Sequence, residues 1–391
     1  MGDNCQAKKV RVLYITNYDS MYGANQSLFY MIKHLKESYN VEPYLLVPGG
    51  GKIGEYCKRE NINCICSDFR ISYLAENTKY MLFRKITRSI MRFTDYIRIY
   101  RKINSLSLKF DLIHSNSSVF DIGYFLAKWW KISYVWHVRE FAKDDYELQN
   151  VISKADELKQ YQKSDAIIAI SDSIMQYIVN KGSNINVCRI YNGIEIVEKY
   201  NKQYCREGIV RFCIVGALNK RKNQIDVVKA CLKLLNENVY QFELYIIGDY
   251  TGVMAEEIDS LCKNWPELDR RIIRTGYCDK VNSLLVDMDV GIMASDKEAF
   301  GRVTIEYMAN YMVVIGTNSG GTPELIEGVG HLYEPHDIVR LAELMKIYIR
   351  NPQLLYDKCQ QNRMRAEKFS AQNNADDVYA VYKSILCSNG K

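Results

Sequence analysis

Short apolar runs and amphipathic segments alternate along most of the chain. Each strand-length run is followed by a segment whose apolar residues recur every three or four positions, as in 25–37 and 54–61. The runs that predict strands are 10–16, 41–47, 112–115, 134–138 and 166–170, followed by 209–215, 242–247, 272–275, 290–294 and 313–317. This order predicts an α/β protein whose parallel sheets are covered by helices on both faces.

A polar stretch, 195–208, interrupts the alternation near the middle of the chain. The chain has 391 residues, which is long for one core and favours two domains. We therefore expect a first doubly wound lobe at 1–195, a linker at 196–208, a second lobe at 209–370, and a C-terminal helix at 371–391 that packs back on the first lobe. Ligands of such sheets bind beyond the carboxyl ends of the strands, the edges that would carry Gly23, His137, Gly216 and Glu298.

The composition is that of a water-soluble globular protein, with 48% apolar and 25% charged residues. No apolar run approaches the roughly 18 residues of a membrane span, and VRVLYIT near the start has no cleavage site behind it. The 12 cysteines are scattered singly, which is typical of reduced thiols. We expect a cytoplasmic protein.

Most of the positive charge lies in the first half of the chain. Residues 1–200 hold 28 Lys+Arg and 21 Asp+Glu, a balance of +7 within a total of +6. Residues 79–109 alone hold nine basic residues and one acid. Apolar residues recur there at helical steps (Phe83, Ile86, Ile90, Phe93, Ile97, Tyr100), and Arg84, Arg88 and Arg92 follow another face. The pattern is typical of a helix on an anionic membrane surface. The alternative is a lobe helix whose stripe joins the core, and both can hold at once. We expect no nucleic-acid partner.

The segment 295–326 contains the most specific pattern. Glu298 and Glu306 flank Phe300-Gly301, where a helix is expected to begin, and Gly320-Gly321 follow a short strand. A helix N-terminus suits a diphosphate, whereas carboxylates repel phosphate and suit the hydroxyls of a ribose or a hexose. The pattern therefore indicates a sugar-nucleotide site. The alternative is an amphipathic helix with solvated acids.

Glu298 and Glu306, with seven residues between them, also look like the E-x7-E signature of retaining glycosyltransferases of family 4, which have the GT-B fold. Other stretches are similar to further parts of that family: VRVLYITNYDSMYGANQSL (10–28), FDLIHSNSS (110–118), YVWHVREF (134–141), CRIYNGIEI (188–196) and CIVGALNKRKNQIDVVKA (213–230). The resemblance implies two Rossmann-like lobes that face an interdomain cleft.

The resemblance also implies roles for single residues. Glu306 would hold the ribose, Glu298 the donor sugar, and Lys222 the leaving diphosphate, whose growing charge a fixed cation stabilises. The expected donor site consists of Gly23, Gly216, Arg221, Lys222, Glu298, Phe300, Gly301, Arg302, Val303, Thr304 and Glu306. Ala217 stands where the family often has Arg, so Arg221 or Lys220 would supply a second cation.

Three catalytic candidates follow, namely His137, Lys222 and Glu298. His137 taken alone is more often structural, but the resemblance places it near the donor hexose. Ala24, Asn25 and Arg139 are expected on the acceptor side. Lysine and a helix end would serve the phosphates, so no metal and no cofactor are expected, and the D-x-D pattern at 287–289 is interpreted as structural.

The predicted function is metal-independent, retaining transfer of a hexose-type sugar from a nucleoside diphosphate, such as a UDP-sugar, to a lipid-linked or growing glycan of polysaccharide biosynthesis. The enzyme would act in the cytoplasm, at the inner face of the membrane. Two alternatives stay open. One is a GT-B epimerase of sugar nucleotides, and the other is a non-catalytic GT-B partner subunit, for which Ala217 is a mild indication.

Overall fold

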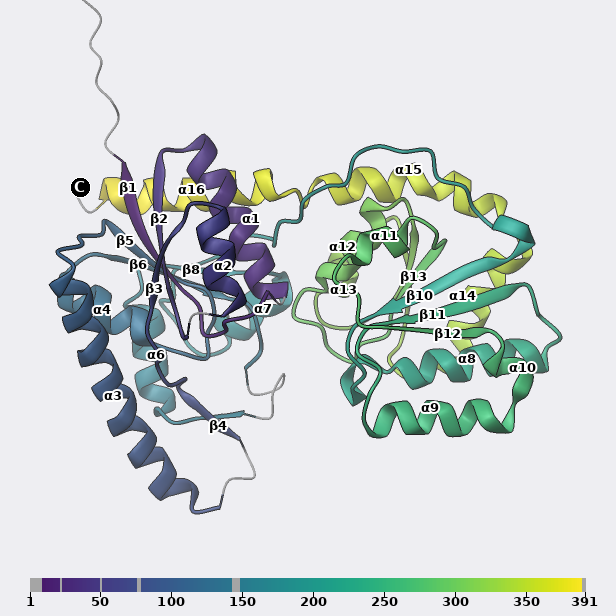
Figure 1. The fold of residues 1–391 in the computed structure, drawn as a ribbon, viewed down its shortest axis with the longest axis horizontal. Coiled ribbons are helices and arrows are strands. Elements are labelled where there is room, and N and C mark those ends of the chain that lie inside the picture. Colours follow the sequence, from purple (N-terminus) through teal and green to yellow (C-terminus); the bar gives the residue numbers. More distant parts are fainter. Residues whose placement is uncertain (1–8, 22, 50, 76–78, 143–147, 389–391) are drawn as a thin grey trace, which may run out of the picture. The chain divides into compact units, whose positions relative to one another are not determined.

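The structure is a computed structural model that describes all residues except 1–8, 22, 50, 76–78, 143–147 and 389–391. The chain falls into two compact units (Figure 1), one formed by Met1–Gly193 with Ala371–Lys391 and the other by Ile194–Ser370. Each unit is built on one parallel sheet. The two α/β lobes predicted from the alternation of strands and helices are therefore confirmed.

The sheet of the first unit is buried on both faces. Its described strands are, in spatial order, β3 (Asn63–Cys66), β2 (Val41–Val47), β1 (Val10–Ile15), β5 (Leu112–Ser115), β6 (Ser133–Val138), β8 (Ala166–Ala169) and β9 (Val187–Arg189). Every residue of β5, β6 and β8 is buried, as expected for a parallel sheet between helix layers. The helices are α1 (Gly23–Ser38), α2 (Lys52–Arg59), α3 (Met81–Ser105), α4 (Ile122–Trp130), α6 (Lys154–Gln162) and α7 (Asp172–Val179), and β4 (Tyr73–Ala75) pairs with β7 (Leu148–Asn150) in a separate antiparallel ladder.

The second unit repeats this architecture. Its described strands are, in spatial order, β12 (Ile272–Gly276), β11 (Phe242–Ile247), β10 (Val210–Val215), β13 (Val290–Met293), β14 (Val313–Thr317) and β15 (His331–Tyr333). The helical elements are η1 (Arg206–Gly208), η2 (Lys220–Lys222), α8 (Gln224–Asn236), α9 (Val253–Asn264), α10 (Pro266–Asp269), α11 (Val281–Leu285), α12 (Arg302–Ala309), α13 (Thr322–Ile326), α14 (Ile338–Arg350) and α15 (Gln353–Glu367). Sequence periodicity missed the edge strands β3, β9 and β15, because three or four residues are too few to show alternation.

The C-terminal helix α16 (Ala371–Ser388) completes the first unit. It lies beside α1 in Figure 1. The rings of Tyr39 and Tyr379 stack with their centroids 4.1 Å apart, and the Tyr39 hydroxyl donates to Asp376 Oδ1 at 2.6 Å. The last helix of the chain therefore returns to the lobe in which the chain begins.

The segment 196–208, expected as a linker, is packed on the second unit. Tyr204 is buried, and its hydroxyl donates to the Tyr311 carbonyl at 2.7 Å. Lys202 Nζ donates to the carbonyls of Leu285 and Asn310, both at 2.9 Å. Burial lowers the pKa of Lys202 to about 8. The polarity of this stretch thus reflects hydrogen bonds to helix ends rather than a free connection.

Helix α3 corrects one detail of the basic pattern. Arg92, expected on a solvated face with Arg84 and Arg88, is buried and pairs with Asp121. The Asp121 carboxylate also accepts from Tyr96 Oη at 2.5 Å and from Ser72 Oγ at 2.7 Å. Burial alone would raise the pKa of Asp121, but the Arg92 charge and the hydrogen bonds from Tyr96, Ser72 and Arg92 together outweigh it, and the pKa lies below its ordinary value. Arg92 is therefore a structural counterion.

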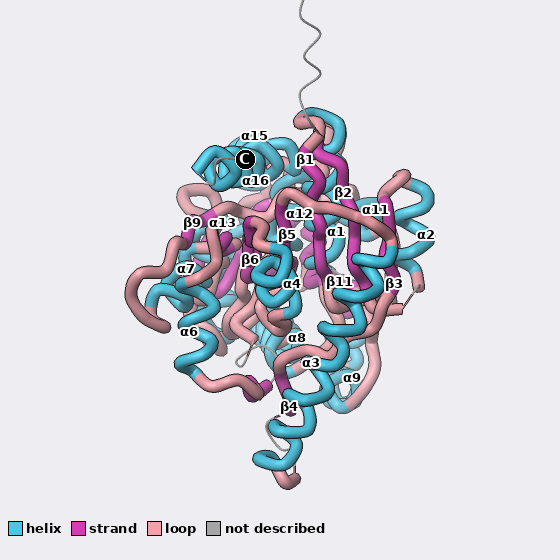
Figure 2. The backbone as a smooth tube through the Cα atoms, turned by 90° about the vertical axis from the view of Figure 1, so that its left-hand side faces the viewer, coloured by secondary structure: helices cyan, strands magenta, loops and turns pink. Residues whose placement is uncertain are grey.

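The apolar stripe of α3 is also divided. Phe83 and Ile86 are 68% and 54% exposed, and Ile90 and Phe93 are also exposed, whereas Ile97 and Tyr100 are half-buried. The buried residues Ile99 and Ile103 lie outside the predicted stripe. The amino-terminal end of α3 projects away from the sheet (Figure 2). The alternative in which the whole stripe joins the core is therefore wrong. Among the described residues no helix has the length and apolar character that crossing a membrane requires.

Candidate functional site

The candidate site of the second unit lies at the carboxyl edge of its sheet. β10 leads through Gly216 into the turn η2 with Lys222, and β13 leads into the loop 294–301 with Glu298. Because β10 and β13 are neighbours in the sheet, the two loops meet. Lys222 Nζ lies 2.6 Å from Glu298 Oε2. The structure thus brings together a cation and a carboxylate of the expected donor site.

Asn219 fixes the turn that holds Lys222. Its side-chain oxygen accepts from the backbone N–H groups of Arg221 and Lys222, both at 3.1 Å, in an N-cap arrangement. Arg221 Nη2 donates to the Lys297 carbonyl at 3.1 Å, so this side chain braces the loop between β13 and α12. Lys220 is exposed to solvent. Of the two cations expected to compensate for Ala217, Arg221 thus has a structural contact in the site.

The environment of Glu298 favours its charged form. Burial would raise the pKa of this carboxyl, but the Lys222 ammonium, a hydrogen bond with Ser295 and the Arg221 charge together place the pKa below its ordinary value. Glu298 is therefore ionised at neutral pH. An ionised carboxylate only accepts hydrogen bonds, and hydroxyl groups are suitable donors to it.

Two glycines give the Glu298 loop its path. Gly301 has φ +86°, a left-handed conformation that favours glycine, and α12 begins directly after it. Gly320 has φ +59°, and a Cβ on it would lie 2.2 Å from the Glu298 carbonyl oxygen. The Gly321 amide donates to that oxygen at 2.7 Å. The Glu298 backbone thus packs directly against the Gly320-Gly321 pair.

Glu306 lies on α12 and pairs with a cation of the same helix. Arg302 Nη2 is 2.9 Å from Glu306 Oε1. Burial raises the pKa of Glu306, although the Arg302 charge opposes this. The Thr304 amide donates to the Gly301 carbonyl at 2.9 Å, so it is already engaged at this helix start. Arg302, expected in the donor site, thus pairs with the carboxylate that is expected to hold the ribose.

In the first unit, Arg139 follows the carboxyl end of β6 and is held by internal contacts. Its Nε donates to Asn116 Oδ1 at 2.6 Å, and its Nη1 donates to Asn192 Oδ1. Nη2 lies 3.3 Å from His137 Nδ1. Burial lowers the pKa of Arg139 to about 9, so the group is still charged at neutral pH. Arg139, expected on the acceptor side, thus fixes the surroundings of His137.

The start of α1 is shaped by the predicted acceptor-side residues. Asn25 is buried and accepts from Thr16 Oγ1 at 2.6 Å, while its amide donates to the Ser20 carbonyl at 2.7 Å. Asn116 Nδ2 donates to the Ala24 carbonyl at 3.3 Å. Gly23 opens the helix, and a Cβ there would meet no atom within 4 Å. Asn25 and Ala24 therefore shape this loop, and Gly23 leaves room beside it.

Sequence reasoning did not single out several residues around His137. His114 and Asn116 lie at the carboxyl end of β5, in the quoted run FDLIHSNSS. Their position at the end of a predicted strand could have indicated them as site residues. Asn192 lies in the quoted run CRIYNGIEI (188–196). Tyr382 comes from α16 and had no signal in the sequence, because only folding brings that helix to β5.

The D-x-D pattern has a structural role at its second acid. Asp289 is buried and accepts from the Arg211 amide at 2.8 Å and from the Cys205 amide at 3.3 Å. Asp287 Oδ1 pairs with Arg206 Nη1 at 2.5 Å. Within the part of the chain that the structure describes, no group of three or more His, Cys, Asp or Glu side chains could hold a metal ion.

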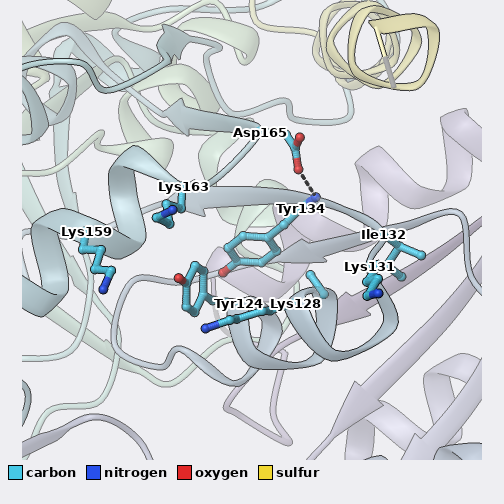
Figure 3. A pocket seen from close by; sticks show the side chains of 9 residues that line it. Tyr124, Lys128, Lys131, Ile132, Tyr134, Lys159, Lys163 and Asp165 are labelled. Atoms are coloured by element: carbon cyan, nitrogen blue, oxygen red, sulfur yellow. Dashed lines mark hydrogen bonds between the residues drawn. The ribbon is translucent and has the colours of Figure 1, made fainter. Parts of the chain in front are cut away.

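A hollow of about 420 Å³ on the first unit is lined by lysines (Figure 3). It lies at the amino edge of the sheet, opposite the carboxyl edge at which ligands of such sheets bind. It is bordered by Tyr124, Lys128, Lys131, Ile132, Tyr134, Lys159, Lys163 and Asp165. Asp165 accepts from the Tyr134 amide at 2.8 Å, at the amino ends of β8 and β6. The lysines come from the C-terminal ends of α4 and α6, where cations complement the helix dipoles and an anion is disfavoured. We therefore do not assign this hollow to phosphate.

Comparison with known proteins gives matches to both lobes. The family model described as Glycosyltransferase Family 4 matches residues 21–198, and that described as Glycosyl transferases group 1 matches residues 210–351. The chain is 27% identical over 246 residues to N-acetyl-alpha-D-glucosaminyl L-malate synthase of Bacillus anthracis, covering 59% of this chain and 63% of that relative. It is 26% identical over 240 residues to the capsular polysaccharide biosynthesis glycosyltransferase CapM of Staphylococcus aureus, covering 56% and 62%. The aligned regions thus span less than two thirds of either relative.

Among solved structures, HepE of Anabaena in complex with UDP has a similar fold. The TM-score is 0.76 at 16% sequence identity, and the match covers 96% of this chain and 100% of that chain. An identity this low shows the fold only.

Proposed function

We propose that this chain, which carries a glycosyltransferase family 4 domain and a group 1 domain in the GT-B fold, transfers a hexose-type sugar from a nucleoside diphosphate to an acceptor hydroxyl. The observation that carries the proposal is the 2.6 Å pair of Lys222 and Glu298 at the carboxyl edge of the second sheet. This edge offers a cation for a diphosphate and, beside it, an ionised carboxylate for sugar hydroxyls. The likeness to HepE with bound UDP supports a UDP-sugar as donor.

The diphosphate would lie between Lys222 and the start of α12. Backbone N–H groups of the first helical turn and the positive end of the helix dipole favour an anion. When the bond to the sugar breaks, negative charge grows on the leaving phosphate, and Lys222 stabilises it as it develops. Glu306 would accept from the ribose hydroxyls, with Arg302 holding its carboxylate in place.

We assign transfer with retention, on one face of the sugar. Glu298 is held by Lys222, and in this assignment it accepts from sugar hydroxyls and does not contact the transferred carbon. The acceptor oxygen then bonds to that carbon while the bond to the diphosphate breaks. The electron pair of the broken bond goes to the leaving phosphate, and a phosphate oxygen takes the proton of the acceptor hydroxyl. Because Lys222 and helix amides carry the phosphate charge in this scheme, we assign no metal.

The acceptor would be a lipid-linked or growing glycan, and the name of the relative CapM supports polysaccharide biosynthesis. The exposed apolar face of α3 supports a site at the inner face of a membrane. Leu82 and Phe83 are 75% and 68% exposed, and Arg84 and Lys85 follow them directly. Apolar side chains flanked by cations can enter the boundary of an anionic bilayer.

Incubation with UDP-glucose, UDP-galactose and UDP-N-acetylglucosamine tests the proposal. The expected result is slow release of UDP from one of these donors. NMR should show that the free sugar first appears as the anomer present in the donor. Conversion of one UDP-sugar into its epimer would show the epimerase alternative instead. If no nucleotide sugar is turned over and none raises the melting temperature, the chain is a partner subunit and the proposal is wrong.

A further inference from the structure

His336 lies in the turn between β15 and α14 and bridges two carboxylates of the second unit. Its Nδ1 lies 2.8 Å from Asp226 Oδ2 on α8, and its Nε2 lies 3.1 Å from Asp296 Oδ1. Asp296 belongs to the loop that presents Glu298, whereas α8 follows the turn that holds Lys222. The bridge therefore connects the two segments that meet in the 2.6 Å pair of Lys222 and Glu298.

These two contacts require the protonated ring. A carboxylate only accepts hydrogen bonds, and a neutral imidazole has one N–H group, so only the imidazolium can donate to both acids. The Asp226 side chain is 12% exposed, and among the described residues its carboxylate has no hydrogen-bond partner besides His336. A largely buried carboxylate is costly without a counterion, and the His336 imidazolium supplies one.

The charges around His336 favour this protonated form. The hydrogen bond with Asp226 is the largest cause that raises the pKa of His336 above its ordinary value, and the charges of Asp296 and Asp226 add to it. Burial and the ammonium of Lys229, which lies on α8, oppose the rise. Because the ring is 60% exposed, water weakens each of these contributions.

The other titratable groups close to the bridge do not replace His336. Burial, with the charges of the two bridged acids, raises the pKa of Tyr333 on β15, so this phenol is neutral. The acids next to His336 in the chain have other partners. Glu334 accepts from Asn318 Nδ2 at 2.8 Å, and Asp337 accepts from the Arg340 amide at 2.9 Å.

Asp296 anchors its loop to several neighbouring segments. Its amide donates to the Arg221 carbonyl at 3.0 Å, and its carbonyl accepts from Ser319 Oγ. Its carboxylate also accepts from Asn223 Nδ2, so His336 adds a charge to an existing support. With a neutral ring, one of the two bridged carboxylates would lose its donor, and two negative charges would face each other. Asp296 is two positions before the carboxylate assigned to the sugar, so a shift here would move that carboxylate.

We propose that protonated His336 is a positioning residue that joins Asp226 to Asp296. It thereby holds the loop that presents Glu298 beside Lys222. The role of this loop in sugar transfer rests on the proposed function, whereas the bridge rests on the contacts alone. His336 contacts no substrate in this scheme. A rise in pH that removes its proton should loosen the loop and slow turnover.

Proton NMR titration of the full chain measures the pKa of His336 without substrate. We expect a value above the ordinary histidine pKa of about 6.5 in the parent. Asp226→Asn and Asp296→Asn should each lower it, because each substitution removes one of the two neighbouring negative charges. His331→Gln is the matched control, because His331 lies against Tyr348 and takes no part in the bridge. It should leave the His336 titration unchanged.

Two substitutions of His336 imitate the two states of its ring, since Gln is neutral at every pH and Lys stays charged up to pH 9. With the donor that the parent turns over, kcat of His336→Gln should be about two- to fivefold below the parent at pH 6, the range of a largely exposed ion pair. At pH 9 the two should be equal. His336→Lys should match the parent at pH 6 and exceed it at pH 9. Comparison at the same pH cancels the titration of groups that parent and variant share.

Two results would overturn the inference: a pKa of His336 at or below the ordinary value in the parent, or a ratio of parental to His336→Gln kcat that does not change with pH. If the parent turns over no nucleotide sugar, the proposed function fails, and hydrogen exchange of residues 294–301 at pH 6 decides the inference instead. Exchange should be faster in His336→Gln than in the parent. Equal exchange would show that the bridge does not hold the loop.

Discussion

Glu298 and Glu306 lie in different electrostatic surroundings, and they are expected to serve different parts of the donor. Lys222 keeps the pKa of Glu298 low, whereas burial raises the pKa of Glu306. Glu306→Ala should weaken the binding of UDP, because the ribose loses its acceptor. Glu298→Ala should leave UDP binding nearly unchanged and depress turnover, because Lys222 stays available to the diphosphate. Calorimetry with UDP measures both, and equal losses in the two variants would contradict the assignment.

Lys222 is expected to carry most of the charge stabilisation of the leaving group. Lys222→Met should lower kcat about 10²–10³-fold, as is typical when one donor to a developing oxyanion is removed. Lys220→Met is the matched control, because Lys220 is exposed in the same short turn. Steady-state kinetics of the two variants should differ by that factor. Similar losses in both would show that the turn acts through its overall charge.

The same lysine links folding stability to pH. Because the pKa of Glu298 is depressed in the folded chain, the pair stabilises the protein above the ordinary carboxyl pKa, and this contribution is lost as the pH falls through the folded pKa. Lys222→Met should therefore reduce the free energy of unfolding by about 1–3 kcal/mol at neutral pH. The difference should shrink in acid, where the unpaired carboxylate takes a proton. Urea titrations of the parent and the variant at neutral and at acidic pH check this. The same difference in the free energy of unfolding at both would contradict it.

At the scale of elements, the loop that presents Glu298 depends on close contact with the turn before α13. Gly320→Ala places a Cβ 2.2 Å from the Glu298 carbonyl oxygen and keeps a left-handed φ of +59°. Gly328→Ala has the same kind of backbone strain at φ +75° but open space around the Cβ. The left-handed conformation alone costs roughly 1–2 kcal/mol.

Gly320→Ala should thus destabilise the chain more than Gly328→Ala and should also reduce turnover, because the Glu298 backbone must move. Thermal unfolding and kinetics of the two variants provide the test. Loss of activity in Gly328→Ala with none in Gly320→Ala would show that the contact does not position the loop.

The exposed half of α3 is the element expected to meet a membrane. The parent should sediment with vesicles of phosphatidylglycerol and phosphatidylcholine, more weakly as salt screens the basic residues. Changing Leu82, Phe83 and Ile86 together to Ser should abolish sedimentation while leaving UDP binding intact. Val253→Ser is the control, since Val253 on the second unit is 75% exposed, like Leu82. Arg92 must be left intact, because its loss would leave the Asp121 charge buried and unpaired.

If the parent ignores these vesicles even at low salt, the apolar face of α3 does not serve a bilayer. A water-soluble acceptor would then be the better assignment for the proposed reaction.

At the scale of the whole molecule, the residues expected on the nucleotide, apart from Gly23 of the first unit, belong to the second of two separately packed units. UDP should therefore slow hydrogen exchange in the segments around Lys222 and in 298–306, because a ligand stabilises the conformation that binds it. Uridine, which lacks the diphosphate, should protect these segments less. Mass spectrometry of exchanged peptides measures this, and protection confined to the first unit would place the nucleotide elsewhere.

The sequence by itself determined the features that depend on residues close together along the chain. Runs such as 166–170 and 290–294 are continuous apolar segments, because parallel strands are buried on both faces, and they match β8 and β13 to within one residue. The three- and four-residue periodicity of 25–37 and 54–61 assigned α1 and α2. The motif residues from Glu298 to Glu306 are close along the chain, so their relation to a helix start was readable from the sequence.

Only the tertiary structure decided which distant groups meet. Lys222 and Glu298 are 76 positions apart, and Tyr382 and His114 are 268 apart, so no local pattern links them. Arg92 looked like its neighbours on α3 until Asp121 of another element supplied a buried charge. Periodicity reports which face of an element is apolar, because that depends on nearby residues. The protonation and pairing of a polar group depend on what the fold packs against it, because desolvation and partner charges act through space.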